Sequence, residues 1–372
     1  MKNKSFIGVA RNIAFMAAVL VTGSCLEYTV KTTVNRDGSL IREYTVKGDS
    51  SDIFKGTLRI PSGKDWTIAA GFDQEAEKDA KEKQYIYTAS RKFSTVGEFR
   101  EWLDSDTASG TVKIKVNLHK RFRWFYTYYE YTEVYPMSFP FTMVPVDSFL
   151  SEIEQSVLKE DGRTAYAPSL KKMIWKSDTL NFHYNHADSL EMKKIEDNCE
   201  DKLGLWMFSA ILTEYADLVK SNSMDDPSLS DITDKLLQHT RLIRDKVFSV
   251  NDSSVVKLLI FMGDSLAGGH GLSAFYARNP QVFNDFENKI KRADEIDFSD
   301  NYEYSLSMPG KVYSSNASER DLLQLTWKFS PMQYFMKEFE MKAESRVANL
   351  WIMIITAISA TGMVLFLLAK RR

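Results

Sequence analysis

Ser265 is the side chain whose setting comes nearest to that of a catalytic nucleophile. It follows an apolar run from Val255 to Met262 and lies in Gly-Asp-Ser-Leu-Ala, which is close to the Gly-x-Ser-x-Gly elbow of acyl-transfer enzymes. Ala267 stands where the second glycine is usual. A serine nucleophile also needs a base within hydrogen-bond reach and donors for the oxyanion. His270 is the only histidine after Ser265, so the sequence offers few candidates for that base.

The run from Val255 to Leu266 resembles the first block of GDSL hydrolases. The resemblance implies a strand that delivers Ser265 as the catalytic serine, but no Gly-x-Asn-Asp block and no late Asp-x-x-His pair follow it. The same residues also predict a helix, capped by residues 251–254 and ended by Gly268 and Gly269. Because the set is incomplete, we expect a protein that is not an enzyme. A membrane-tethered serine hydrolase is the alternative.

Residues that could hold a metal or a cofactor are few. His183, His186 and Asp188 are possible zinc ligands in a short polar stretch, but no cysteine cluster and no His-Glu-x-x-His motif accompanies them. The glycines that follow Ala267 lack the Lys-Ser/Thr ending of a phosphate-binding loop. We therefore expect no metal and no cofactor.

An aromatic segment, residues 121–141, is the most unusual internal feature of the chain. On a strand, Trp124, Tyr126 and Tyr128 share one face, while Tyr129 and Tyr131 lie on the other. Two interpretations stay open. The segment is a central strand covered on one side by helices, or these five residues form a binding surface for a ligand, a partner or lipid headgroups. The aromatic residues are Phe122, Trp124, Phe125, Tyr126, Tyr128, Tyr129, Tyr131, Tyr135, Phe139 and Phe141.

The C-terminal residues predict a transmembrane helix. Residues 347–369 carry no charge and are followed by Lys370, Arg371 and Arg372. At about 1.5 Å per residue, this stretch spans a hydrocarbon layer of about 30 Å. Basic residues stay on the cytoplasmic side, which places the tail, 370–372, inside the cell and the rest of the chain outside the cytoplasm. We expect a bacterial inner-membrane protein with its ectodomain in the periplasm.

The N-terminus predicts export as well. Residues 1–24 combine basic residues, an apolar run and small residues before Cys25, which is typical of a bacterial lipoprotein signal. Acylation of Cys25 is the favoured interpretation; simple cleavage and an uncleaved signal anchor are the alternatives. Cys199 is the only other cysteine, so an acylated Cys25 leaves no intramolecular disulfide.

Charge excludes one class of partner. The chain has 48 basic and 50 acidic residues, and this balance predicts no attraction to nucleic acid. The expected partners are the membrane lipid bilayer and another envelope protein.

The pattern of apolar residues predicts an α+β protein, a discontinuous antiparallel β domain with a large helical insertion and one C-terminal transmembrane helix. Asp37-Gly38 between two alternating runs predicts a hairpin, and the late strands are expected to complete the sheet begun near Cys25. Both membrane anchors would then leave the same sheet. The expected parts are a signal peptide at 1–24, β-rich segments at 25–145 and 298–330, a helical insertion at 146–297, a juxtamembrane helix at 331–346, a transmembrane helix at 347–369 and a tail at 370–372.

The turns at Asp37-Gly38-Ser39 and Pro309-Gly310-Lys311-Val312, with Trp327 in the last strand before the membrane helix, resemble those of LppM-like bacterial envelope lipoproteins. The resemblance covers only the outer β portions, since the helical insertion departs from it. It implies a membrane-anchored envelope domain that binds or organises something, without an assigned reaction. The predicted function is therefore a non-enzymatic binding or assembly module at the outer face of the inner membrane.

Overall fold

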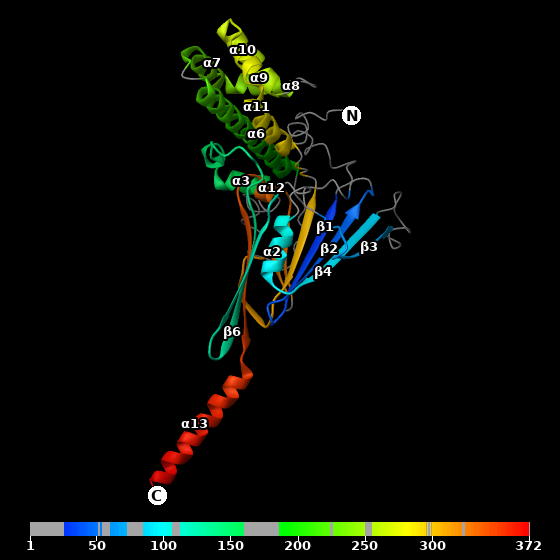
Figure 1. The fold of residues 1–372 in the computed structure, drawn as a ribbon, viewed down its shortest axis with the longest axis vertical. Coiled ribbons are helices and arrows are strands. Elements are labelled where there is room, and N and C mark those ends of the chain that lie inside the picture. The colour runs from blue at the N-terminus through cyan, green and yellow to red at the C-terminus, as the bar shows by residue number, and fades with distance from the viewer. Residues whose placement is uncertain are drawn as a thin grey trace. The chain divides into compact units, whose positions relative to one another are not determined.

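Two compact units make up the described part of the chain (Figure 1). A β unit comprises Cys25–Pro136, Asp300–Lys328 and Glu338–Arg372, and a helical unit includes Met137–Ser299 and Phe329–Lys337. The predicted signal segment, Cys25 and His183 lie outside the described residues. The computed structural model describes residues 26–50, 53, 60–72, 85–105, 112–159, 186–223, 226–249, 255–294, 296, 298, 300–321 and 324–371.

A seven-stranded sheet forms one layer of the β unit, in the order β3-β4-β2-β1-β7-β10-β9. The predicted hairpin is present: β1 and β2 pair antiparallel, and Gly38 takes a φ of 98° in the turn, which favours glycine. β7 pairs parallel with β1, so the expectation of a purely antiparallel domain is wrong. The helical unit separates these two strands in sequence, and a long connection permits parallel pairing. The strands are β1 Glu27–Val34, β2 Leu40–Gly48, β3 Thr67–Phe72, β4 Tyr85–Phe93, β7 Asn301–Ser307, β9 Glu319–Arg320 and β10 Leu325–Phe329.

A second, four-stranded sheet has the order β5-β6-β11-β8, with antiparallel pairing throughout. The late strands do not complete a single sheet as expected, because β7 and β8 belong to different sheets. Gly310 makes the turn between them with a φ of 79°, and a Cβ there would lie 2.3 Å from the Arg346 carbonyl oxygen. The turn therefore requires glycine. The strands are β5 Lys115–Phe122, β6 Tyr126–Tyr135, β8 Lys311–Ser315 and β11 Phe339–Ala348.

The predicted juxtamembrane helix at 331–346 is wrong. Only α12, Met332–Phe335, is helical, and Phe339–Ala348 is the strand β11. Charged residues at 340, 342, 344 and 346 alternate with Met341, Ala343 and Ser345, which are buried. This period of two is typical of a strand with one buried face.

The apolar helix α13, Leu350–Lys370, is long and apolar enough to cross a membrane. It begins three residues after the predicted start because Val347 and Ala348 still belong to β11. Almost all of its side chains are exposed, since only 6% of its most apolar 18 residues are buried. A helix of 21 residues is about 31 Å long, which matches the hydrocarbon thickness.

The two expected anchors, Cys25 and α13, are not joined to strands of the same sheet, contrary to expectation. β1, which follows the position of Cys25, lies in the seven-stranded sheet, whereas β11, which runs into α13, lies in the four-stranded one. The β1–β2 turn contacts the α13 end of β6, because Tyr129 Oη donates to the Arg36 carbonyl at 2.6 Å. Leu26 is therefore at the end of β1 away from α13, about 26 Å along the strand.

The helical unit buries one apolar core that includes Trp206, Phe139 and Phe335. Ser151 caps α3 through a capping box, and Asp226 caps α7. Polar side chains at several nearby positions can cap, so the sequence alone does not choose among them. The elements are η2 Val146–Ser148, α3 Glu152–Leu158, α6 His186–Asn222, α7 Pro227–Gln238, α8 Thr240–Ser249, α9 Val255–Ala267, α10 Gly271–Arg278 and α11 Pro280–Asp294, with α12.

Candidate membrane-proximal site

The strand β6 divides the predicted aromatic surface between its two faces. Tyr129 and Tyr131 are 2% and 0% exposed, so they are core residues and cannot form a binding surface. Tyr126 and Tyr128 are partly exposed on the opposite face, and Trp124, in the β5–β6 turn, is 59% exposed. β6 is a central strand, as one interpretation held, but its inner face packs on the seven-stranded sheet and not on the expected helices. The other interpretation survives only for its outer face.

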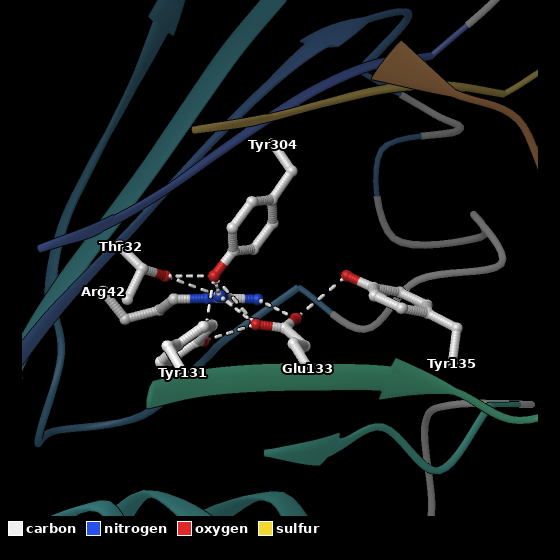
Figure 2. A network of polar contacts seen from close by, with 6 residues as sticks. All are labelled: Thr32, Arg42, Tyr131, Glu133, Tyr135 and Tyr304. Atoms are coloured by element: carbon white, nitrogen blue, oxygen red, sulfur yellow. Dashed lines mark hydrogen bonds and ion pairs between the residues drawn. The ribbon is translucent and has the colours of Figure 1, made fainter. Parts of the chain in front are cut away.

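The inner face of β6 carries a buried polar network between the two sheets of the β unit (Figure 2). The Arg42 guanidinium, from β2, donates two hydrogen bonds of 2.9 Å to the two Glu133 carboxylate oxygens. Tyr131 and Tyr304 donate to one of these oxygens, at 2.6 and 2.8 Å, and Tyr135 donates to the other at 3.0 Å. Every acceptor position of the carboxylate is therefore used within the protein.

Electrostatic interactions keep the Glu133 carboxylate of this network ionised. Burial alone would raise the pKa of Glu133, but Arg42 and the tyrosine hydroxyls outweigh it and hold that pKa below its usual value. Burial raises the pKa of Tyr131 and Tyr135 well above the ordinary range, and Glu133 raises them further. The tyrosines are thus neutral donors to a carboxylate that stays ionised. Because Arg42 and Glu133 are 1% and 0% exposed, the pair joins the sheets and offers no surface to a ligand.

This network is not predicted from the sequence, although the alternating pattern of β2 and β6 places a charged residue on the buried face of each strand. Arg42 shares the buried face of β2 with Leu40 and Tyr44, and Glu133 stands between Tyr131 and Tyr135 on the buried face of β6. A charged residue on the buried phase of an alternating strand requires a partner, because an unpaired buried charge is very costly. The sequence holds both charges but does not show which pairs with which.

The junction between the four-stranded sheet and α13 is made by Asn349. Its backbone N–H donates to the Phe125 carbonyl at 2.9 Å, and its side-chain amide donates to the Arg123 carbonyl at 2.8 Å. Its side-chain oxygen accepts from Thr127 Oγ1 at 2.9 Å. The β5–β6 turn is thereby fastened to the residue between β11 and the apolar helix α13, and Figure 1 shows the tip of the β6 hairpin near the start of α13.

The turn extends along the first turns of α13. Trp124 Nε1 donates to Thr356 Oγ1 at 3.2 Å. Thr356 is six residues after Leu350, which is about 9 Å along a helix. Phe122 and Phe125, on either side of Trp124, are 56% and 43% exposed. Exposed aromatic residues beside one end of an apolar helix of membrane-span length are the kind that a membrane–water interface favours.

The outer face of the four-stranded sheet places cations beside tyrosines. The Arg346 guanidinium lies 4.8 Å from the centre of the Tyr126 ring. The ring of Tyr128 packs edge-on against that of Tyr313, with centroids 6.3 Å apart. Tyr313 Oη donates to Glu344 at 2.7 Å, which lowers the pKa of that carboxyl. This face combines exposed aromatic surface with positive charge, and a planar or anionic group could bind to it.

Ser265 lies on the exposed side of the helix α9, so the strand implied by the GDSL resemblance is not present. Gly269 N–H donates to the Asp264 carbonyl at 3.1 Å, and Gly268 has a φ of 66°; together they end the helix as the alternative interpretation predicted. The Asp264 carboxylate is occupied by the backbone N–H groups of Leu272 and Ser273 at the start of α10. It does not act on Ser265.

The remaining predicted site residues give no cluster that the structure describes. His186 is the first residue of α6, and no group of three or more potential metal ligands occurs among the described residues. Cys199 is buried and free, and burial raises the pKa of its thiol to about 11. Such a thiol is protonated at neutral pH and is a poor nucleophile or ligand.

Comparison with known proteins adds a structural likeness. The chain is similar to the NMR structure of the folded domain of Mycobacterium tuberculosis LppM, with a TM-score of 0.29 and 10% sequence identity over 89% of this chain and 95% of that one. No protein-family model and no curated protein matches it. The expected α+β architecture is confirmed by the elements of the structure, and α13 is the one helix among the described residues that is long and apolar enough to cross a membrane.

Proposed function

We propose that this protein is a membrane-anchored envelope lipoprotein that acts, without catalysis, as a binding or assembly module at the outer face of the inner membrane. The observation that carries this proposal is the junction at Asn349, which fastens the β5–β6 turn to the first residue before the membrane helix. A sheet mounted in this way presents its outer face at a fixed height above the bilayer.

We call the attachment of the four-stranded sheet to α13 through Asn349 the mount. It leaves little room for independent motion of the sheet and the membrane helix. β11 ends at Ala348 and α13 begins at Leu350, so Asn349 alone separates them. Its side chain is 8% exposed and bonds the backbone of Arg123 and the hydroxyl of Thr127. Short connections with satisfied hydrogen bonds restrict backbone freedom, which supports a module that positions a partner rather than one that searches on a flexible tether.

The expected topology follows from the basic tail. Lys370, Arg371 and Arg372 favour a cytoplasmic C-terminus, which puts both compact units in the periplasm. Acylation of Cys25 would add a second anchor. Leu26 lies at the end of β1 away from α13. A lipid on Cys25 would therefore reach the bilayer that holds α13 only if the polypeptide before β1 turned back along the β unit.

Photocrosslinking in intact cells tests the proposal. A photoreactive amino acid at Tyr128 of the full chain should give a defined adduct with phospholipid or with one envelope protein, because Tyr128 is on the exposed face. The same group at Asn117, which is exposed on β5 farther from α13, is the matched control and should give less of that adduct. Equal or absent adducts at the two positions would count against a surface that works at the membrane.

Fluorophosphonate labelling tests the absence of catalysis. The full chain in native membranes should take up no label at Ser265. Covalent labelling that is lost in Ser265→Ala would establish the hydrolase alternative and refute the non-enzymatic part of the proposal.

A further inference from the structure

The membrane end of the four-stranded sheet carries a row of cations that crosses all four strands. In the register of the sheet, Arg121 of β5 is opposite Tyr128 of β6, Tyr128 is opposite Arg346 of β11, and Arg346 is opposite Lys311 of β8. Directly paired residues of antiparallel strands project from the same face. Since neighbouring strands are about 4.8 Å apart, the row from Arg121 to Lys311 is about 14 Å wide.

Arg123 extends this cationic row by one step towards α13. Its backbone exchanges hydrogen bonds of 2.8 and 3.1 Å with Tyr126, so the two residues pair across the β5–β6 turn. Side chains two apart on a strand share a face, which places Arg123 beside Arg121 and Tyr126 beside Tyr128. We define the cationic row as Arg121, Arg123, Lys311 and Arg346.

No carboxylate of the described chain neutralises the cationic row. Among the described residues none of its four members forms an ion pair, and Arg121, Arg123 and Lys311 are exposed. The acidic residues nearest to it along the strands are engaged elsewhere: Lys342 binds Glu130 at 2.9 Å and Glu344 at 3.4 Å. Positive charge is thus concentrated in the residues nearest α13, while ion pairs begin one step farther away.

The position of the cationic row indicates which anionic group it binds. Asn349 and Trp124 fix the row at the level where α13 enters the bilayer. The negative groups available at that level are lipid headgroups, and arginine binds phosphate with planar, bidentate geometry. Basic residues just outside a membrane helix attract anionic lipids over distances of about a Debye length.

We infer that the cationic row, with Tyr126 and Tyr128 between its members, binds the headgroups of anionic phospholipids in the leaflet that α13 enters from the β unit. The tyrosines supply hydroxyl donors and ring faces between the charges, and Arg346 is held over the Tyr126 ring. This inference rests on the proposed membrane mount and names its lipid partner. It predicts that anionic lipid is enriched beside the β5–β6 turn.

Quenching of tryptophan fluorescence by brominated lipids tests the inference on the full chain in nanodiscs. Trp351 is the second residue of α13, and Trp124, in the β5–β6 turn, bonds Thr356 of that helix. They are 60% and 59% exposed, so lipid beside them quenches their emission. Brominated phosphatidylglycerol should quench at a lower mole fraction than brominated phosphatidylcholine. At about 1 kcal/mol per basic residue, each lost cation should reduce this preference by about fivefold.

Matched variants locate the effect. Arg121→Gln and Arg346→Gln should each reduce the preference for phosphatidylglycerol, and Arg121→Lys should retain most of it. Lys115→Gln removes the same charge from the same face of β5, six residues farther from the turn, and should leave the preference unchanged. The preference should also fall when NaCl is raised from about 0.05 M to about 0.5 M, since salt screens exposed charges.

Five outcomes decide the inference. An undiminished preference in Arg121→Gln/Arg346→Gln, or an equal loss in Lys115→Gln, would overturn it. Abolition of the preference by millimolar inorganic phosphate would assign the row to a free anion in place of lipid, and would also overturn it. Quenching by neither lipid would show that neither the turn nor the start of α13 meets lipid, which refutes the proposed mount itself. Equal quenching by both lipids would leave the mount intact and refute only the lipid preference.

Discussion

The two faces of β6 use similar residues in opposite ways. On the inner face, Arg42 is paired with Glu133 and surrounded by tyrosine hydroxyls, and all of these groups are buried. On the outer face, Arg346 and Arg121 flank Tyr128 without a carboxylate partner among the described residues. A saturated network stabilises a fold, whereas cations left unpaired at a surface are available to a ligand. The difference separates the structural centre of the β unit from its candidate site.

The largest expected effect comes from Glu133. In Glu133→Leu, the Arg42 guanidinium stays buried without a carboxylate, which should lower the free energy of unfolding by about 3–5 kcal/mol. Urea denaturation of the full chain in detergent, followed by tryptophan fluorescence, measures it. The double variant Arg42→Met/Glu133→Leu should recover much of the loss. A single variant as stable as the parent would show that the inner network does not hold the two sheets together.

The same pair predicts how stability depends on pH. The pKa of Glu133 is lower in the folded protein than in the unfolded chain, so its contribution is fully present above the unfolded value of about 4.3 and is lost as the pH falls through the lower folded value. Stability measured between about pH 6 and pH 3 should therefore decrease more steeply in the parent than in Arg42→Met/Glu133→Leu. Identical slopes would contradict an ionised Glu133.

A smaller effect is expected at the junction. Asn349→Ala removes two strong side-chain hydrogen bonds to the β5–β6 turn, which should cost about 1–3 kcal/mol locally. Hydrogen exchange should show faster exchange of the backbone amides from Arg123 to Thr127, with the inner strands unchanged. Protection that survives in Asn349→Ala would mean that the turn is held by other contacts and that the mount does not depend on this residue.

The smallest effect on stability is expected from the outer face itself. Arg121→Gln removes an exposed cation without an ion pair, so the free energy of unfolding should change by no more than about 0.5 kcal/mol. The urea midpoint measures this change. A loss comparable to that of Glu133→Leu would show that the outer cations are structural, and the contrast between the two faces would disappear.

The sequence is sufficient for the elements that show a long, regular pattern. The apolar run that forms α13, the Asp37-Gly38 hairpin and the helices after Pro145 all follow from local periodicity and turn residues. The expectation of a helix at 331–346 neglects the strict alternation of charge from Glu340 to Arg346, which is typical of a strand with one buried face.

Only part of the candidate site can be predicted from local sequence patterns. Alternation along β6 separates Tyr126 and Tyr128 from Tyr129 and Tyr131, but it does not tell which side is covered. The cationic row needs the register of four strands that are far apart in sequence, and local patterns do not fix that register. Asn349 carries no motif, and its role is visible only when the β5–β6 turn is placed beside it.

Depth measurements along β5 test the central claim, the mount of the four-stranded sheet at the membrane surface, most directly. Spin labels at residues 115, 117, 119, 121 and 123 of the full chain, in a Cys199→Ser background, sample positions about 6.6 Å apart on one face. Collision with oxygen relative to a water-soluble nickel chelate should be highest at 123, intermediate at 121 and at the aqueous level from 119 to 115. Aqueous values at all five positions would contradict the mount.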